Sequence, residues 1–78
     1  MPKKEFLRET DLAALAKRFR EQSGKTRAGA GRELGVSHVS IHRAEENPEI
    51  SLLKLRLRMI EEYSPFKVTG PFYCLKRK

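Results

Sequence analysis

The sequence has little of what commonly cross-links or anchors a small protein. It contains one cysteine, Cys74, no tryptophan and only 8% aromatic residues. A single cysteine excludes an internal disulfide bond and a zinc site built from several thiolates. No apolar run approaches the ~20 residues of a membrane-spanning helix, and Glu5, Arg8 and Glu9 interrupt any secretory signal. We therefore expect a cytoplasmic, nucleoid-associated protein without metal, cofactor or membrane partner.

Acidic residues are also scarce relative to basic ones. The 78 residues include 17 Lys and Arg against 10 Asp and Glu, a net charge of +7. Such an excess attracts polyanions, so nucleic acid is the first candidate partner and an anionic membrane surface the second. A chain this short predicts one domain, residues 1–78, with a modest core. It shows no nucleophile–base pair, phosphate-binding glycine loop or carboxylate cluster, so we expect no enzyme.

The first half predicts two helices. Thr10 is a suitable N-cap, and apolar residues at helical spacing predict an amphipathic helix over 11–22. A second helix is predicted over 26–34 with Thr26 as its N-cap, although Gly29 and Gly31 each cost roughly 1 kcal/mol of helix stability relative to alanine. A glycine retained inside a helix usually permits close packing, so we expect Gly31 to lie where a third helix approaches.

A tight turn and that third helix follow. Gly35 is placed to turn the chain through a left-handed conformation, and Ser37 can cap a helix over 37–45. The residues expected to face the core are Ala30, Leu34, Val36, Ile41 and Ala44. A helix–turn–helix unit over 27–46 with this inner face projects its second helix outward, where it fits the B-DNA major groove, about 12 Å wide.

The segment 52–63 has two interpretations. Its alternation of apolar and basic side chains is typical of a half-buried strand, yet its residues are strong helix formers. We favour a helix, on which one apolar stripe is formed by Leu52, Leu55, Met59 and Tyr63. With the helices before it, the predicted fold is mainly α, a four-helix domain.

The C-terminal segment 64–78 predicts a short β element. Residues 66–75 have strand-like composition, interrupted by a kink or turn at Gly70–Pro71, and Lys76–Arg77–Lys78 should be a mobile basic tail. Its apolar residues are too many for a tail, and we expect them to form a homodimer interface: Phe66, Phe72, Tyr73 and Leu75. At the other end, residues 1–9 form an arm in which Glu5–Phe6–Leu7 could add an edge strand.

The helix–turn–helix pattern resembles the phage Cro and lambda-repressor-like family, also called the xenobiotic-response-element family. The resemblance rests on Gly31, Gly35 and the inner-face residues, and residues 34–45 look like the family's turn and recognition helix. It covers 11–63 and implies a lambda-repressor-like DNA-binding domain. It also implies a buried salt bridge between Arg20 and Glu45.

Two residues depart from the family's pattern. Arg27 stands where the family usually has a glutamine, and because it cannot accept a hydrogen bond, a phosphate contact is its expected role. Ala44 stands where the family has a large apolar residue, so the core there must be filled from elsewhere, with Leu53, Leu57 or the C-terminal aromatics as candidates.

The residues expected to contact DNA follow from this arrangement. The predicted base-reading residues near the start of the third helix are His38, Val39, His42 and Arg43. Arg43 could donate two hydrogen bonds to guanine, and Val39 could contact a thymine methyl group. The predicted phosphate contacts are Lys25, Thr26, Arg27, Ser37 and Ser40, and Lys3 and Lys4 could reach along the duplex. His38 and His42 lack a third ligand, so no metal is expected.

The sequence therefore predicts a sequence-specific, DNA-binding transcriptional regulator that acts as a homodimer and represses by occluding its operator. Three alternatives stay open. The protein could be an antitoxin-like DNA-binding protein whose C-terminal segment caps a toxin. It could be a basic RNA-binding module, or an interaction module that binds no nucleic acid at all.

Overall fold

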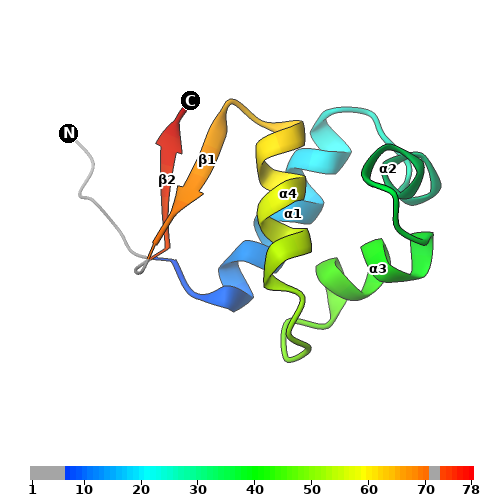
Figure 1. The fold of residues 1–78 in the computed structure, drawn as a ribbon, viewed down its shortest axis with the longest axis horizontal. Coiled ribbons are helices and arrows are strands. Elements are labelled where there is room, and N and C mark those ends of the chain that lie inside the picture. The colour runs from blue at the N-terminus through cyan, green and yellow to red at the C-terminus, as the bar shows by residue number, and fades with distance from the viewer. Residues whose placement is uncertain (1–6, 71–72) are drawn as a thin grey trace.

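The computed structural model describes residues 7–70 and 73–78, which form four helices and a β-hairpin (Figure 1). The elements are α1 (Glu9–Gln22), α2 (Arg27–Leu34), α3 (His38–Glu46), α4 (Leu53–Tyr63), β1 (Phe66–Thr69) and β2 (Cys74–Arg77). The predicted mainly α fold with a short C-terminal β element is confirmed. Lys3, Lys4 and Phe72 lie outside the described residues. No helix among the described residues has the length and apolar character needed to cross a membrane.

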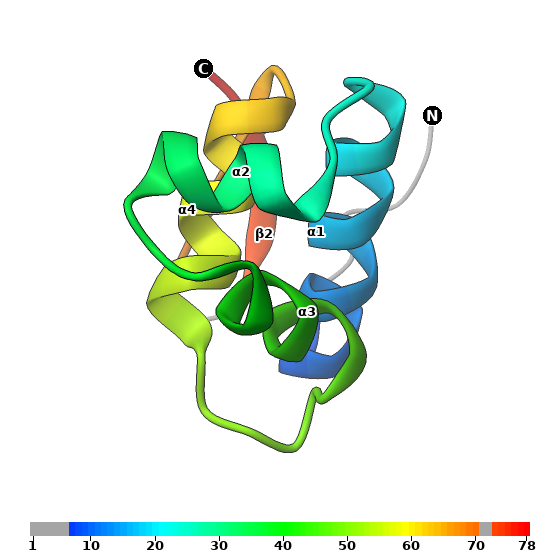
Figure 2. The same ribbon diagram turned by 90° about the vertical axis from the view of Figure 1, so that its right-hand side faces the viewer.

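The core lies between α1 and α4, which pack side by side in the middle of the molecule (Figures 1 and 2). At one end α3 packs on both of these helices and α2 packs on α3, and at the other end the hairpin packs on α4. The buried cluster draws on all four helices: Leu12, Ala16, Ala30, Leu34, Ile41, Ala44, Leu55, Met59, Ile60 and Tyr63. The helix over 52–63 is thus confirmed against the strand, because its apolar stripe faces this core.

The start of α1 differs from the prediction. The helix begins at Glu9, so Thr10 lies in its first turn and the predicted Thr10 cap is wrong. The Asp11 carboxylate instead accepts a hydrogen bond from the Arg8 backbone N–H at 2.8 Å. An acidic side chain three residues into a helix satisfies a free N–H there and favours the helix dipole. The arm before α1 is correspondingly shorter than residues 1–9.

The C-terminal basic residues are not a mobile tail. Antiparallel pairing places Lys76 opposite Lys67 and Arg77 opposite Phe66, and the Lys78 backbone N–H donates to the Pro65 carbonyl at 3.0 Å. The expectation of a tail over 76–78 is wrong because these residues gain backbone hydrogen bonds that their composition does not reveal. Strand β2 is therefore the second strand of an antiparallel pair with β1.

The hairpin alternates an inner and an outer face, as strands do. Val68, Tyr73 and Leu75 pack against the core, while Lys67 and Lys76 are exposed. The Phe66 ring lies 6.1 Å from the ring of Phe19 on α1. The Tyr73 carbonyl accepts a hydrogen bond from the Leu7 backbone N–H at 2.6 Å. Leu7 therefore extends the pairing by one bridge, and Glu5 and Phe6 of the predicted edge strand lie outside the described residues.

Candidate nucleic-acid interface

The turn between α2 and α3 depends on two glycines. Gly35 ends α2 with a φ of +73°, a left-handed conformation that side chains other than glycine rarely adopt. A Cβ built on Gly31 would lie 2.6 Å from the Val36 carbonyl oxygen, closer than van der Waals contact permits. Gly31 thus lets the turn lie directly on α2, and this contact sets the angle at which α3 leaves the turn.

Both helices of this unit are capped by the predicted hydroxyl groups. The Gly29 backbone N–H donates to Thr26 Oγ1 at 3.0 Å, and the Ser40 backbone N–H donates to Ser37 Oγ at 3.1 Å. The Ser40 hydroxyl also lies 3.1 Å from that of Ser37. Each cap satisfies one of the backbone donors left free at a helix start, and the remaining N–H groups keep the positive end of the dipole exposed.

Helix α3 has an inner and an outer side. Ile41, Ala44 and Glu45 are buried, whereas the predicted base-reading residues are exposed: His38, Val39, His42 and Arg43. The apolar side chain of Val39 is 44% exposed. Figure 2 views the molecule from the end that carries α2 and α3. Within the described residues Arg43 forms no ion pair, so its guanidinium is available to a ligand.

The structure contains the buried ion pair between Arg20 and Glu45 that the family resemblance implies. Arg20 Nε and Nη2 donate to the two Glu45 carboxylate oxygens at 2.5 and 3.0 Å. The hydrogen bond to Glu45 raises the pKa of Arg20. Arg20 Nη1 donates in addition to the Lys25 carbonyl at 2.7 Å. One side chain on α1 therefore holds both the end of α3 and the loop before α2.

Arg27 lies in the same charged network. Its Nε donates to Glu45 Oε1 at 3.0 Å, and its Nη2 donates to Glu46 Oε2 at 2.8 Å. Glu46 also accepts from Lys17 Nζ at 2.7 Å, which holds the pKa of the Glu46 carboxyl below its ordinary value. A phosphate contact from Arg27 thus competes with two carboxylates, and the structure gives this residue a second role in joining α2 to α3.

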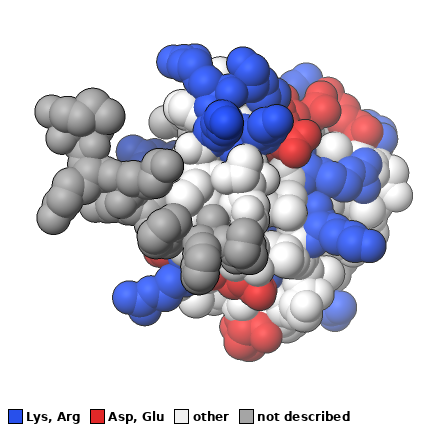
Figure 3. All heavy atoms as spheres, turned by 60° about the vertical axis from the view of Figure 1, so that its left-hand side comes forward, with Lys and Arg blue, Asp and Glu red and all other residues white. Residues whose placement is uncertain are grey.

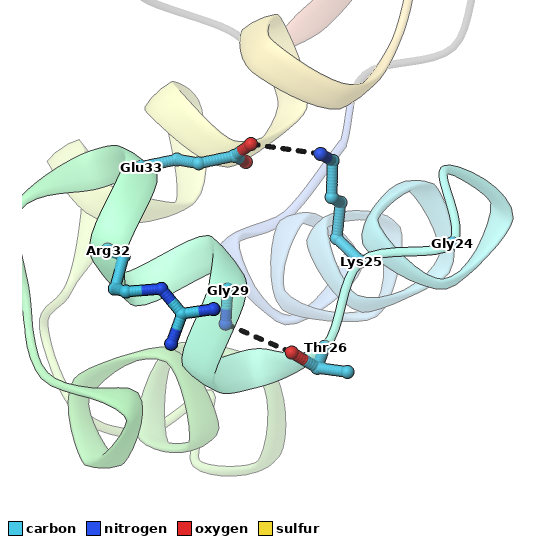
Figure 4. Close-up of a pocket in the computed structure, with 6 residues that line it drawn as sticks. All are labelled: Gly24, Lys25, Thr26, Gly29, Arg32 and Glu33. Carbon is cyan, nitrogen blue, oxygen red and sulfur yellow. Dashed lines mark hydrogen bonds and ion pairs between the residues drawn. The ribbon is translucent and has the colours of Figure 1, made fainter.

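The other predicted phosphate ligands include Lys25 and Thr26, which lie at the N-terminus of α2. A shallow hollow here is lined by Gly24, Lys25, Thr26, Gly29, Arg32 and Glu33 (Figure 4). Lys25 Nζ forms an ion pair with Glu33 at 2.9 Å, and Figure 4 shows the Arg32 side chain extending toward Gly29. The hollow is open to solvent, and its basic groups lie beside the positive end of α2.

Two arginines of α4 complete the positioning of the unit, and neither role was predicted from the sequence. Arg56 is fully buried, and its Nε and Nη2 donate to the carbonyls of Ala44 and Asn47, each at 2.8 Å. Arg58 Nη2 donates to the Leu34 carbonyl at 2.8 Å. These carbonyls end α3 and α2, where free acceptors and the negative dipole end favour a cation.

Leu53 and Leu57, two of the residues expected to fill the core near Ala44, are partly buried against the core. The Arg56 guanidinium donates to the Ala44 carbonyl. Its Nη1 has no hydrogen-bond partner among the described residues and lies 3.7 Å from Glu9 Oε1. One sequence feature pointed to burial, because residue 56 falls between Leu52 and Ile60 on the apolar side of the helical wheel.

The arrangement defines a class of domain. Two short helices joined by a left-handed glycine turn, with the second helix exposed on its outer side, form a helix-turn-helix. Residues 11–46 match the family model of a helix-turn-helix domain. No curated protein and no solved structure shows a significant match to the chain.

The matched segment covers α1 from its third residue, all of α2 and α3, and ends before α4. This part of the chain therefore matches a helix-turn-helix domain, and a domain of this class implies DNA binding. The described residues contain no group of three or more His, Cys, Asp or Glu side chains placed to hold a metal ion.

Proposed function

We propose that the protein is a sequence-specific DNA-binding regulator of transcription that inserts α3 into the major groove. The observation that carries this proposal is the division of α3 into a tightly anchored inner side and an exposed outer side. Glu45 is held by Arg20 and Arg27, and the end of the helix is held by Arg56. A helix fixed in this way presents its outer side chains in one defined orientation, as base recognition requires.

Each outer residue has a suitable partner on a base edge. Arg43 donates to O6 and N7 of guanine, His38 and His42 donate to the same acceptors or to phosphate, and Val39 contacts a thymine methyl group. The capped starts of α2 and α3 supply backbone N–H groups to the phosphates. Lys25, Thr26, Ser37 and Ser40 support these phosphate contacts.

The proposed regulatory effect is repression by occlusion of the operator, with two copies of the chain on a palindromic site. Dimerisation through Phe66, Phe72, Tyr73 and Leu75 stays a prediction. Tyr73 and Leu75 already pack against the core of their own chain, and Phe66 contacts Phe19. Sedimentation of wild type beside Phe72→Asp tests the dimer, and monomeric profiles for both would remove it.

Selection of bound sites from random duplex DNA tests the proposed function. We expect a defined consensus for wild type, and Arg43→Ala should cost about 1–3 kcal/mol of binding and relax one base position. Arg18→Ala is the matched control, because Arg18 is exposed on α1 and its replacement removes the same charge. Equal enrichment of all sequences by wild type, or an unchanged consensus for Arg43→Ala, would refute α3 as the reading helix.

A further inference from the structure

The positive charge of the chain is concentrated away from the helix-turn-helix. Residues 27–46 carry three basic and three acidic side chains, so this unit is neutral. Residues 64–78 carry no acidic side chain and four basic ones, Lys67, Lys76, Arg77 and Lys78. These fifteen residues therefore contribute +4 of the net charge of +7. The hairpin is the most positive part of the molecule, although it is not part of the reading unit.

The outer face of the hairpin places like charges together. Lys67 and Lys76 are direct cross-strand partners, and both side chains are exposed. Like charges directly opposite each other destabilise a strand pair. In the described part of the chain, neither Lys67 nor Lys76 forms an ion pair with a carboxylate. Both ammonium groups are therefore accessible to an anionic partner outside the chain.

The hairpin also lies far from the reading helix. The molecule extends 37 Å along its longest axis, and Figure 1 shows α2 and α3 toward one end of this axis and the hairpin at the other. In Figure 3, which brings the hairpin side forward, Lys and Arg atoms gather at the upper edge, the height at which Figure 1 places the C-terminus. A straight duplex seated on α3 does not reach this edge, and DNA is too stiff to bend around so short a molecule without a large cost.

We propose that the outer face of the hairpin, centred on Lys67 and Lys76, binds the phosphate backbone of a second DNA segment. The contact is independent of sequence, because two flexible lysines recognise phosphate charge rather than base edges. One molecule then joins two duplexes, one read by α3 and one held by the hairpin. This inference rests on the proposed function for the first duplex only.

A bridging assay tests the proposal. Beads carry a duplex with the selected site, protein is added at low salt, and retention of a second, fluorescent duplex of unrelated sequence is measured. We expect wild type to retain the second duplex and Lys67→Gln/Lys76→Gln to reduce this retention by at least about tenfold. Because each lysine that binds a phosphate adds roughly one to the salt slope, the slope for unrelated DNA should fall by about two in this variant.

The matched control is Arg8→Gln/Lys54→Gln, which removes the same charge from two exposed residues outside the hairpin. It should bridge like wild type. The amount of protein held on the beads measures binding to the first duplex separately. If the proposed function is wrong, the beads retain no protein, whereas if only the bridging proposal is wrong, they retain protein but no fluorescent duplex. Circular dichroism and the urea midpoint verify that the hairpin variant is folded, and relief of the Lys67–Lys76 repulsion predicts a midpoint no lower than that of wild type.

Three results would overturn the proposal. Wild type could hold the first duplex without retaining the second. The hairpin variant could bridge as well as wild type, as expected if two copies of α3 in a dimer do the bridging. The hairpin lysines could instead be needed only for binding structured RNA or an acidic protein, with duplex retention unchanged.

Discussion

Substitution of Gly31 by alanine tests the contact on which the helix-turn-helix depends. In an ordinary helix this change stabilises by about 1 kcal/mol, because glycine is the poorer helix former. Here the added Cβ would lie 2.6 Å from the Val36 carbonyl oxygen and 3.3 Å from the His38 backbone nitrogen. Both neighbours are backbone atoms, so the turn and the first residue of α3 must move to relieve the overlap.

The expected direction of the change in stability follows from comparing the gain in helix propensity with the cost of the overlap. Overpacking of a filled site typically costs about 1–3 kcal/mol, and a clash with backbone belongs at the upper end or above. After the gain in helix propensity, Gly31→Ala should lower the free energy of unfolding by about 1–2 kcal/mol, or roughly 4–16 °C in Tm for a domain of this size. Binding to the selected site should weaken further, because the start of α3 is displaced.

Gly29→Ala is the control in the same helix. The added Cβ would lie 3.2 Å from Thr26 Oγ1 and 3.8 Å from Arg32 Nη2, both of them side-chain atoms. We expect unchanged or slightly increased stability and unchanged DNA binding. Urea unfolding followed by circular dichroism measures both variants. Equal stability and equal binding of the two variants would refute the reasoning that the turn lies on Gly31.

Two further predictions concern charged side chains. Arg56→Met should lower the free energy of unfolding by about 1–3 kcal/mol for each carbonyl left without a donor at the end of α3. Urea unfolding measures this loss, and binding to the selected site should weaken as well. An unaltered urea midpoint would contradict the positioning role of Arg56. Lowering the pH should remove the contribution of Glu46, whose folded pKa is held below its ordinary value of 4.5 by Lys17. A lowered pKa stabilises the fold above the unfolded value, and this stabilisation disappears as the pH falls through the folded value. Glu46→Gln should therefore show a smaller drop in urea midpoint between about pH 6 and about pH 3 than wild type, and an identical drop would argue against the Lys17 contact.

Local chemistry accounts for the predictions that succeeded. Thr26, Ser37 and Gly35 act within a few residues of themselves, so their caps and the left-handed turn are visible in the sequence. The helix over 52–63 was also predictable, because propensity and a broad apolar stripe outweighed the alternation. The predicted cap of α1 was wrong, because the helix begins at Glu9, where the Asp11 carboxylate accepts from the Arg8 backbone N–H, and Thr10 lies within the first turn.

The partners of the charged side chains could not be predicted from neighbouring residues in this way. From the sequence, Arg27 was expected to be available for a phosphate contact, but α3 brings Glu45 and Glu46 to it from 18 and 19 residues away. No partner was predicted for Arg56, which reaches the end of α3 from the apolar side of α4. The base-reading and phosphate residues stay predictions, because exposure alone does not identify what a side chain binds.

By itself, the sequence determined the helices, the caps of α2 and α3 and the tight turn, because each depends on residues within about one helical turn. The tertiary structure alone decided which carboxylates and carbonyls the arginines contact, and that the basic C-terminus is a strand rather than a tail. Ion pairs and strand pairs join residues that are distant in the chain, and one sequence shows their charges and propensities without showing their partners.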